Sequence, residues 1–387
     1  MEHLHTYFKM MLCIFCMSCT AGHDWSPQKN PILPTLKTEG TSQSLLIVNN
    51  LSEDFSMIHD LHSNPTIQNH IPMNPSDEFD SASCQGPNDL KRFNGFFYLV
   101  CSLNQQIHMF DEHSLAPKRI ISLGNGINPM ELAFLDPSHA YVSSFLKDKI
   151  LALNPTHEPI QPRILEEIEL GQLQLETLSQ GPTRPRPSGL LLWNQKLYVT
   201  LSNLDQNFIS GGPGYLAIIN TETNTIEKIL QTHGRNPVSI VHSELPTLTH
   251  LLFIINTGTY QTGKGFMGDG KIDIFDLKQE QIVHTIDIGG APLEMKIAQN
   301  GLAYLSNSKE AKILKWDAVH HKILPSIALH STICTEPLQY VSALEIEDEL
   351  LYATEFNADC LFMIDRNSDL IKHEFKTGDG PDLMALW

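Results

Sequence analysis

The sequence is poor in basic residues, and beyond position 17 it has no long apolar run. Lysine and arginine number 26 against 44 aspartate and glutamate residues, which gives a formal charge of −18. Because nucleic-acid binding relies on clustered lysine and arginine, this balance argues against a nucleic-acid partner. A membrane-spanning helix needs about 20 consecutive apolar residues, and no later run approaches that length. The HExxH, GxSxG and Walker sequences are also missing, so the mechanisms that depend on them are not indicated.

The first 19 residues have the layout of a secretory signal. A basic residue, Lys9, precedes the apolar run Met10–Met17, and small residues follow up to Ala21; this order is typical of a signal peptide. The stretch Cys16–Cys19 also resembles the lipobox of bacterial lipoproteins, with cysteine where leucine is usual. Two outcomes stay open, lipidation of Cys19 and plain cleavage after Ala21. Both predict an extracytoplasmic location, in the periplasm or outer envelope, where a lipid anchor would be the membrane contact.

Residues 20–43 are polar, contain proline and show no periodicity. A segment of this composition buries too little apolar surface to order itself, so we expect a flexible tether. The remainder, residues 44–387, carries the repeats described next, and we expect it to form one domain.

Seven prolines, each in a turn just ahead of an apolar segment, divide this domain into repeats. They stand 42 to 58 residues apart, at Pro87, Pro129, Pro187, Pro237, Pro292, Pro337 and Pro381. The segments that follow are short, rich in valine, isoleucine, leucine and tyrosine, and bounded by turn residues, which is typical of strands. A period of this size indicates a propeller. The sequence therefore predicts an all-β fold, a seven-bladed β-propeller of four-stranded antiparallel blades.

The two ends of the domain are complementary. Residues 44–73 supply three strands with no proline-led strand before them, while the chain stops after one proline-led strand, Pro381–Trp387. We therefore expect the C-terminal strand to complete the first blade as its inner strand. Such a closure leaves no open blade edge.

Cysteine is scarce, and the four cysteines outside the N-terminal region fall into two similar pairs. Cys84 and Cys334 each stand three residues before a repeat proline, and Cys101 and Cys360 come later in the same blades, near the same rim. We predict the disulfides Cys84–Cys101 and Cys334–Cys360, formed in an oxidising compartment. Four buried free thiols are the alternative.

Several strands share a short motif. It reads YVSS at Tyr141–Ser144, YVTLSN at Tyr198–Asn203, YLSNS at Tyr304–Ser308 and YATEFN at Tyr352–Asn357. With the strands that follow, these segments resemble the YVTN-family seven-bladed propellers of bacterial secreted and surface proteins. The resemblance covers roughly residues 45–387 and implies a scaffold whose members include binding proteins and relatives of sugar-lactonase propellers. A shared fold does not carry an activity with it.

The inner strands predict which side chains face the central channel. Two positions after the proline stand Asp89, Glu131 and Glu294, and alternation along a strand turns them inward, with Lys91 and Lys296 one pleat further on. Three inward carboxylates can bind a hard cation, so Ca²⁺ in the channel is one interpretation. A solvated channel in which the two lysines offset the acids is the other.

Polar residues in the turns around the channel mouth are the candidate ligand-binding residues, because rigid scaffolds usually bind through such loops. They are Asn128, Arg186, Asn203, Arg235, Asn236, Asn256, Asn307, Glu355, Asn357 and Asp382. Two longer loops, Leu204–Gly214 and Thr257–Gly270, follow in neighbouring blades. They form one wall of a site, or they are mobile glycine-rich crossings with no ligand.

Three functions are compatible with these features. The first is an extracytoplasmic binding module, a monomer that takes a protein or a small molecule at the channel mouth and is not an enzyme. The second is a lactonase-like or other hydrolase that uses Asp89, Glu131 and Glu294. The third is a structural protein of the cell envelope.

Overall fold

The computed structural model describes residues 44–73, 83–156, 163–176, 182–334 and 336–387. Within these ranges every regular element is a strand, and no helix is long and apolar enough to cross a membrane. The signal expected at residues 1–19, the tether at 20–43 and the lipidation candidate Cys19 lie outside the described residues.

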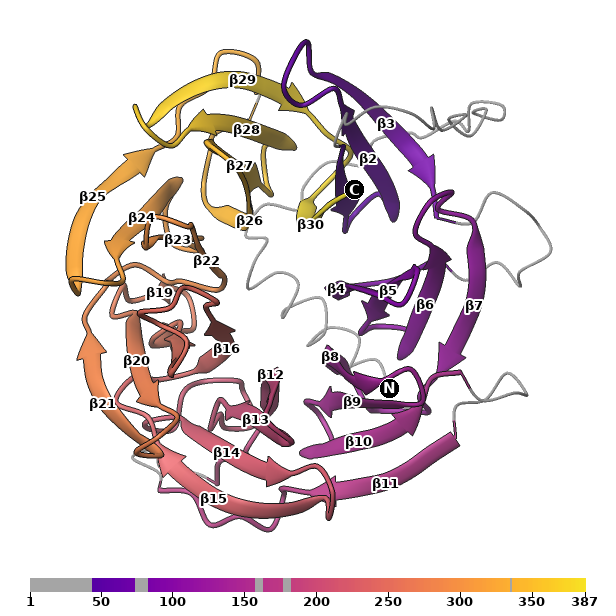
Figure 1. Cartoon of the computed structure of the whole chain (residues 1–387), viewed down its shortest axis with the longest axis vertical. Helices are drawn as coiled ribbons and strands as arrows, with labels where there is room; N and C mark the ends of the chain where they lie inside the picture. The colour runs from indigo at the N-terminus through magenta and orange to yellow at the C-terminus, as the bar shows by residue number, and fades with distance from the viewer. Residues whose placement is uncertain (1–43, 74–82, 157–162, 177–181, 335) are drawn as a thin grey trace.

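The strands form seven four-stranded antiparallel sheets arranged around a central channel (Figure 1), so the predicted seven-bladed β-propeller is confirmed. The first blade contains β30 (Pro381–Leu386), β1 (Leu45–Asn49), β2 (Asp54–His59) and β3 (Thr66–Pro72). The second contains β4 (Pro87–Phe93), β5 (Phe96–Cys101), β6 (Gln106–Asp111) and β7 (Pro117–Ser122). The third contains β8 (Pro129–Asp136), β9 (His139–Ser144), β10 (Lys149–Asn154) and β11 (Arg163–Glu169).

The next four blades complete the ring. They contain β12 (Pro187–Trp193), β13 (Lys196–Leu201), β14 (Tyr215–Asn220) and β15 (Thr225–Gln231); β16 (Pro237–His242), β17 (Leu251–Asn256), β20 (Lys271–Asp276) and β21 (Gln281–Ile286); β22 (Met295–Ile297), β23 (Leu302–Leu305), β24 (Lys312–Asp317) and β25 (Lys322–Ala328); and β26 (Val341–Glu347), β27 (Leu350–Glu355), β28 (Cys360–Asp365) and β29 (Leu370–Lys376). A small hairpin, β18 (Tyr260–Gln261) with β19 (Gly265–Phe266), projects from the fifth blade.

The C-terminal strand closes the ring as predicted. Strand β30 pairs antiparallel with β1, with Leu386 opposite Leu45 and Met384 opposite Ile47, and it lies beside the N-terminal strands in Figure 1. The last strand of the chain is therefore the inner strand of the first blade.

The core lies between the blades, because each sheet buries both faces against its neighbours. The two middle strands of a blade carry most of this burial, and all six residues of β17 are buried. Trp316 on β24 is fully buried and meets Phe253 on β17 edge-to-face, with 5.6 Å between ring centroids. The outermost strands, such as β21, have mostly exposed or half-exposed side chains. Burial of each large apolar side chain stabilises the ring by about 1.5–3 kcal/mol.

Hydrogen bonds at the head of each inner strand join the blades into a ring. In most interfaces a side chain of one blade donates to the carbonyl of the repeat proline at or just before the next inner strand: Asn50 to Pro87, Asn88 to Pro129, Ser202 to Pro237, Thr257 to Pro292 and Ser342 to Pro381. The remaining two interfaces use Ser143 with the Ser188 carbonyl and the Asn307 N–H with the Val341 carbonyl. The repeated proline is thus an acceptor that links neighbouring blades.

The sequence analysis placed Pro337 just ahead of an inner strand, like the other repeat prolines, and this placement is wrong. The inner strand of the seventh blade begins four residues later, at Val341, which pairs with Glu355 as Pro87 pairs with Cys101 in the second blade. Pro337 is exposed. The residues equivalent to the channel-facing and inter-blade positions are therefore Ala343 and Leu344, because the segment before Val341 is an additional stretch that folds over the Glu355 carboxylate.

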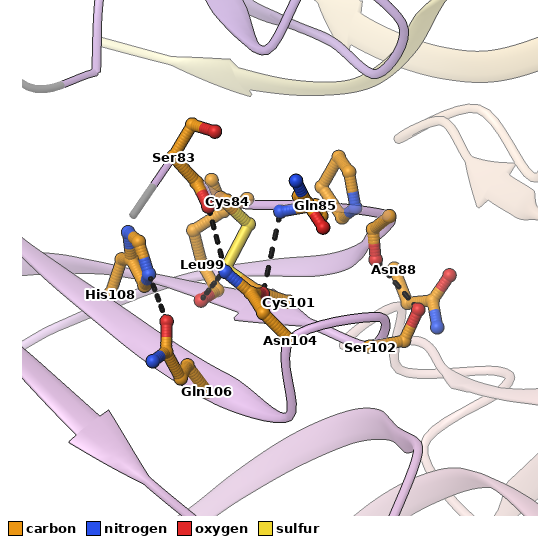
Figure 2. The surroundings of a disulfide bond; sticks show 12 residues. Ser83, Cys84, Gln85, Asn88, Leu99, Cys101, Ser102, Asn104, Gln106 and His108 are labelled. Atoms are coloured by element: carbon orange, nitrogen blue, oxygen red, sulfur yellow. Dashed lines mark hydrogen bonds between the residues drawn. A yellow bond between two sulfur atoms is a disulfide. The ribbon is translucent and has the colours of Figure 1, made fainter. Parts of the chain in front are cut away.

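Two disulfides are formed, Cys84–Cys101 and Cys334–Cys360, the pairs expected from the sequence. The first ties the turn before β4 to the end of β5 (Figure 2), and Asn104 holds the same turn by donating to the Ser83 carbonyl at 2.7 Å. The second ties the segment before β26 to the start of β28. Both bonds fit an oxidising environment.

Candidate functional site

A cavity of about 560 Å³ occupies the central channel at the end where the inner strands begin. All seven blades contribute to its wall, through inner-strand residues such as Glu131 and Lys296 and through turn residues such as Asn50 and Phe356. Cavities of this size accommodate small organic molecules. The mouth predicted from the turns is therefore a concave site.

The inner wall carries ion pairs between the charged residues predicted to face the channel. Lys91 Nζ lies 3.2 Å from Asp89 Oδ1 and 2.8 Å from Glu131 Oε1. Burial lowers the pKa of Lys91, but the two carboxylates outweigh it and raise that pKa above its ordinary value. Burial also raises the pKa of the Asp89 carboxyl, with Lys91 opposing and Glu131 adding to the shift.

The same arrangement recurs on the sixth blade. Lys296 Nζ lies 3.0 Å from Glu294 Oε1 and 3.2 Å from Glu345 Oε2. Burial lowers the pKa of Lys296, but Glu294 and Glu345 outweigh it and raise that pKa. Each channel lysine thus holds two carboxylates.

The inward carboxylates also connect neighbouring blades. Asp89 accepts the backbone N–H of Leu132 at 2.9 Å, Glu131 that of Leu190 at 2.8 Å, and Glu294 that of Leu344 at 2.9 Å. Within the described residues, no group of three or more His, Cys, Asp or Glu side chains is placed to hold a metal ion. The geometry therefore gives no support to Ca²⁺ bound by Asp89, Glu131 and Glu294, and it matches the alternative in which lysines offset the acids.

Asp382, at the start of β30, is different from these three carboxylates. It lines the cavity, and its Oδ2 accepts a hydrogen bond from Asn50 Nδ2 at 3.0 Å. Within the described part of the chain, Asn50 is its only hydrogen-bond partner and no lysine or arginine pairs with it. Burial raises the pKa of Asp382 to about 6, against the hydrogen bond from Asn50 and with a contribution from Glu294.

Three pairs of aromatic rings surround the cavity, and the sequence analysis missed them. The pairs are Phe145 with Phe208, Tyr260 with Phe266, and Tyr340 with Phe356, whose ring centroids lie 6.0, 5.4 and 5.7 Å apart. All six rings line the cavity. They come from turns of the third, fourth, fifth and seventh blades.

One signal for these rings was present in the sequence. Phe145 and Phe356 directly follow the last residue of their second strands, β9 and β27. Serine or threonine holds this position in other blades, as at Ser202 and Thr257, where the hydroxyl donates to the next blade. An aromatic ring in place of a small donor indicates a different role.

Arg186 is a candidate residue that the structure places against one aromatic pair. Its guanidinium carbon lies 5.5 Å from the Phe145 ring centroid and 5.0 Å from that of Phe208. The residue is 5% exposed, its Nε has no hydrogen-bond partner among the described residues, and its φ of 52° is the left-handed conformation that bulky residues rarely adopt. Arg186 supports the rim from behind and does not line the cavity.

Four candidates are fully buried structural residues. Asn203, Asn256, Asn307 and Glu355 each have 0% exposure. Asn203 donates to the Pro213 carbonyl at 2.8 Å, and Glu355 accepts the N–H groups of Gln339 and Tyr340. Their prediction as ligand-binding residues is not supported, because a polar residue at the end of a buried second strand fastens the adjoining turn.

The remaining candidates divide into two groups. Asn128, Asn236 and Asp382 line the cavity, whereas Arg235 and Asn357 are half-buried beside it. The two longer loops take part through Leu204 and Phe208 from one and through the β18–β19 hairpin from the other. This favours the interpretation of the loops as one wall of a site.

The fold and the cavity define a seven-bladed β-propeller with a ligand-sized site at one end of its channel. No family model matches the chain, and no curated protein matches it either. Solved structures with the same fold include a proposed 6-phosphogluconolactonase from Bacteroides uniformis, with 11% identity over 90% of this chain and 100% of that one and a TM-score of 0.63.

Two further structures show the same likeness. Another proposed 6-phosphogluconolactonase, from Bacteroides fragilis, has 12% identity over 91% of this chain and 99% of that one, with a TM-score of 0.63. Hydrazine synthase from Kuenenia stuttgartiensis has 12% identity over 76% of this chain and 88% of that one, with a TM-score of 0.58. At such identities the likeness concerns the fold alone.

Proposed function

We propose that this chain is a monomeric extracytoplasmic binding propeller of the YVTN type, which takes a small organic ligand at the mouth of its central channel. The observation that carries the proposal is the 560 Å³ cavity, which three aromatic pairs surround and whose inner wall holds paired lysines and carboxylates. An apolar wall with a few convergent polar groups is the usual composition of a small-molecule site. The inner-wall ions are engaged between blades, which supports binding over catalysis.

The location proposal rests on the two disulfides, because such bonds persist outside the reducing cytoplasm. Lipidation at Cys19 and cleavage after Ala21 are distinguished by the mass of the mature N-terminal peptide. Cell fractionation together with thiol counting tests the compartment. Recovery of a cytoplasmic protein with four free thiols at Cys84, Cys101, Cys334 and Cys360 would contradict it. Light scattering of the purified chain tests the monomer.

A ligand screen tests the binding function. A panel of neutral, anionic and cationic small molecules is applied to the full chain, and binding is followed by ligand-observed NMR and by thermal shift. Hits that occupy the cavity lose affinity in Phe208→Ala and Phe266→Leu, because both rings line it. Phe375→Leu is the control, since Phe375 is half-buried on the outer strand β29. Hits that respond equally to all three variants, or an absence of hits, count against the proposal.

A lactone hydrolase is the second candidate, favoured by one observation. The Asp382 carboxyl, with its pKa raised to about 6 by burial, is suited to accept a proton near neutral pH. Both Bacteroides neighbours carry a lactonase description. A phosphorylated substrate fits the cavity poorly, because four carboxylates line it against two lysines that are already paired. Acid release from gluconolactone, abolished by Asp382→Asn, would establish the hydrolase.

A further inference from the structure

Two residues that line the cavity carry buried hydrogen-bond acceptors without a donor in the described part of the chain. Asn50 is 7% exposed, and its amide nitrogen donates to Asp382 Oδ2 at 3.0 Å and to the Pro87 carbonyl at 3.5 Å. Its Oδ1 is buried and has no hydrogen-bond partner in the described part of the chain. The Oδ1 atom of Asn128, which also lines the cavity, is likewise buried and has no hydrogen-bond partner among the described residues. A buried acceptor without a donor costs about 1–3 kcal/mol, so these atoms favour a ligand with N–H groups.

The charge around these acceptors favours a cation. Asp382 and Glu294 face the cavity, and the two lysines that line it, Lys91 and Lys296, each already bind two carboxylates. Within the described residues Asp382 therefore has no cationic partner of its own. The net charge of −18 adds a long-range attraction for cations.

An aromatic pair lies near the start of β30, the strand that carries Asp382. The rings of Tyr340 and Phe356 are stacked, with 5.7 Å between centroids and 19° between planes. A Cβ placed on Gly380, two residues before Asp382, would lie 3.0 Å from Phe356 Cζ, so the Phe356 ring is packed against the start of β30. Aromatic faces attract cations, and the attraction is larger when water is excluded.

The chain itself places a cation over Phe145, the ring that holds the same position in its blade as Phe356. The Arg186 guanidinium lies over both Phe145 and Phe208, at 5.5 and 5.0 Å from their centroids. Arg186 directly precedes β12, the inner strand of the blade after Phe145, and the residue in the same place after Phe356 is Gly380, directly before β30. The third and fourth blades therefore show, with a protein side chain, the kind of contact that the seventh blade offers to a ligand.

We propose that the cavity mouth binds a protonated primary amine, whose ammonium group donates to Asp382 and to Asn50 Oδ1 while its apolar body lies against Phe356. This rests on the proposed binding function and names the ligand class for the same site. An ammonium group has three donors and one positive charge, which matches the unpaired acceptors and the carboxylate together. The amine is a free small molecule or the lysine side chain of a partner, because both present the same group.

The test compares two molecules of similar shape, 2-phenylethylamine and 2-phenylethanol, by ligand-observed NMR titration of the full chain at neutral pH. We expect the amine to bind at least about tenfold more tightly than the alcohol, because charge-assisted hydrogen bonds are the stronger ones. Asp382→Asn should weaken amine binding about tenfold or more, and Phe356→Leu should weaken it several-fold. Nα-acetyl-lysine amide distinguishes the sources, since tighter binding than that of the amine indicates a lysine of a partner protein.

Asp60→Asn is the matched control, because Asp60 is exposed after β2 at the opposite end of the ring and should leave binding unchanged. A melting curve of each variant confirms that it folds. Equal binding of amine and alcohol, or full amine affinity in Asp382→Asn, overturns ammonium recognition and leaves the cavity as a binding site. Binding of neutral molecules without binding of the amine would likewise overturn ammonium recognition and leave the cavity as a binding site. Failure of every probe and of the wider panel overturns both proposals.

Discussion

The carboxylate of Glu131 accepts a hydrogen bond from the backbone N–H of Leu190, at 2.8 Å, and these two residues belong to neighbouring blades. The other oxygen of the same carboxylate lies 2.8 Å from Lys91 Nζ, on the blade before it. One side chain thus connects three successive inner strands.

Glu131→Ala should destabilise the protein by about 2 kcal/mol, because it leaves the Leu190 N–H without its acceptor and Lys91 with one carboxylate fewer. Glu131→Gln, which keeps an acceptor oxygen, should cost less. Denaturant unfolding measures both. Glu222→Ala, in an exposed turn, is the control, and a loss in Glu222→Ala as large as that in Glu131→Ala would contradict the inter-blade role.

Removal of the disulfides should lower stability. The bonds close segments of 17 and 26 residues, and loops of this length contribute about 3 kcal/mol in the chain-entropy model. The double variants Cys84→Ala/Cys101→Ala and Cys334→Ala/Cys360→Ala are compared with the native chain by urea unfolding, with and without reductant. Native stability that is insensitive to reductant would show that the bonds contribute nothing.

Asp382→Asn should stabilise the unliganded protein at neutral and higher pH. Burial raises the Asp382 pKa from 3.8 to about 6, so the folded state holds a proton that the unfolded state has already lost. The resulting penalty is absent below about pH 4, grows as the pH rises, and is complete above about pH 6. We expect a gain of about 3 kcal/mol well above pH 6 and no gain near pH 3. Melting curves of the variant and the native chain across this pH range measure the gain. A stability difference that is the same at all pH values would rule out titration of Asp382 as the cause.

Gly189→Ala should weaken the contact between the fourth and fifth blades. A Cβ at Gly189 would lie 2.7 Å from the Val238 carbonyl oxygen and 2.9 Å from Ser239 Cα, which are backbone atoms that cannot move aside cheaply. We expect a loss of about 1–3 kcal/mol in thermal or denaturant unfolding. Gly171→Ala is the control, because its nearest neighbour would be 3.7 Å away.

Deletion of residues 381–387 should prevent the ring from closing. Strand β30 supplies the inner strand of the first blade, so the deletion exposes β1 and removes the Ser342 bond to the Pro381 carbonyl. Proteolysis and circular dichroism should show an unfolded or aggregated chain. The single change Trp387→Ala, at a half-buried position, should retain the fold. A truncated chain with a native melting curve would contradict the closure.

Position in a repeat was enough to predict the fold and the disulfides. Turn prolines such as Pro129 and alternating apolar strands recur along the chain, so blade number, ring closure through Leu386 and the pairing of Cys84 with Cys101 follow from local patterns. The predicted start of the seventh inner strand at Pro337 was wrong because an additional segment precedes Val341. A short motif does not reveal such an insertion.

The sequence by itself determined a closed seven-bladed ring with charged residues turned into its channel, because strand alternation and the repeat period are local properties. Only the tertiary structure decided which of the polar turn residues face the cavity, since Arg186 and Asn236 both stand directly before the proline of an inner strand but only Asn236 lines the wall. It also decided the aromatic rim, because Phe145 and Phe208 stand on different blades. Contacts between distant segments depend on how the loops pack, and a periodic pattern does not specify that packing.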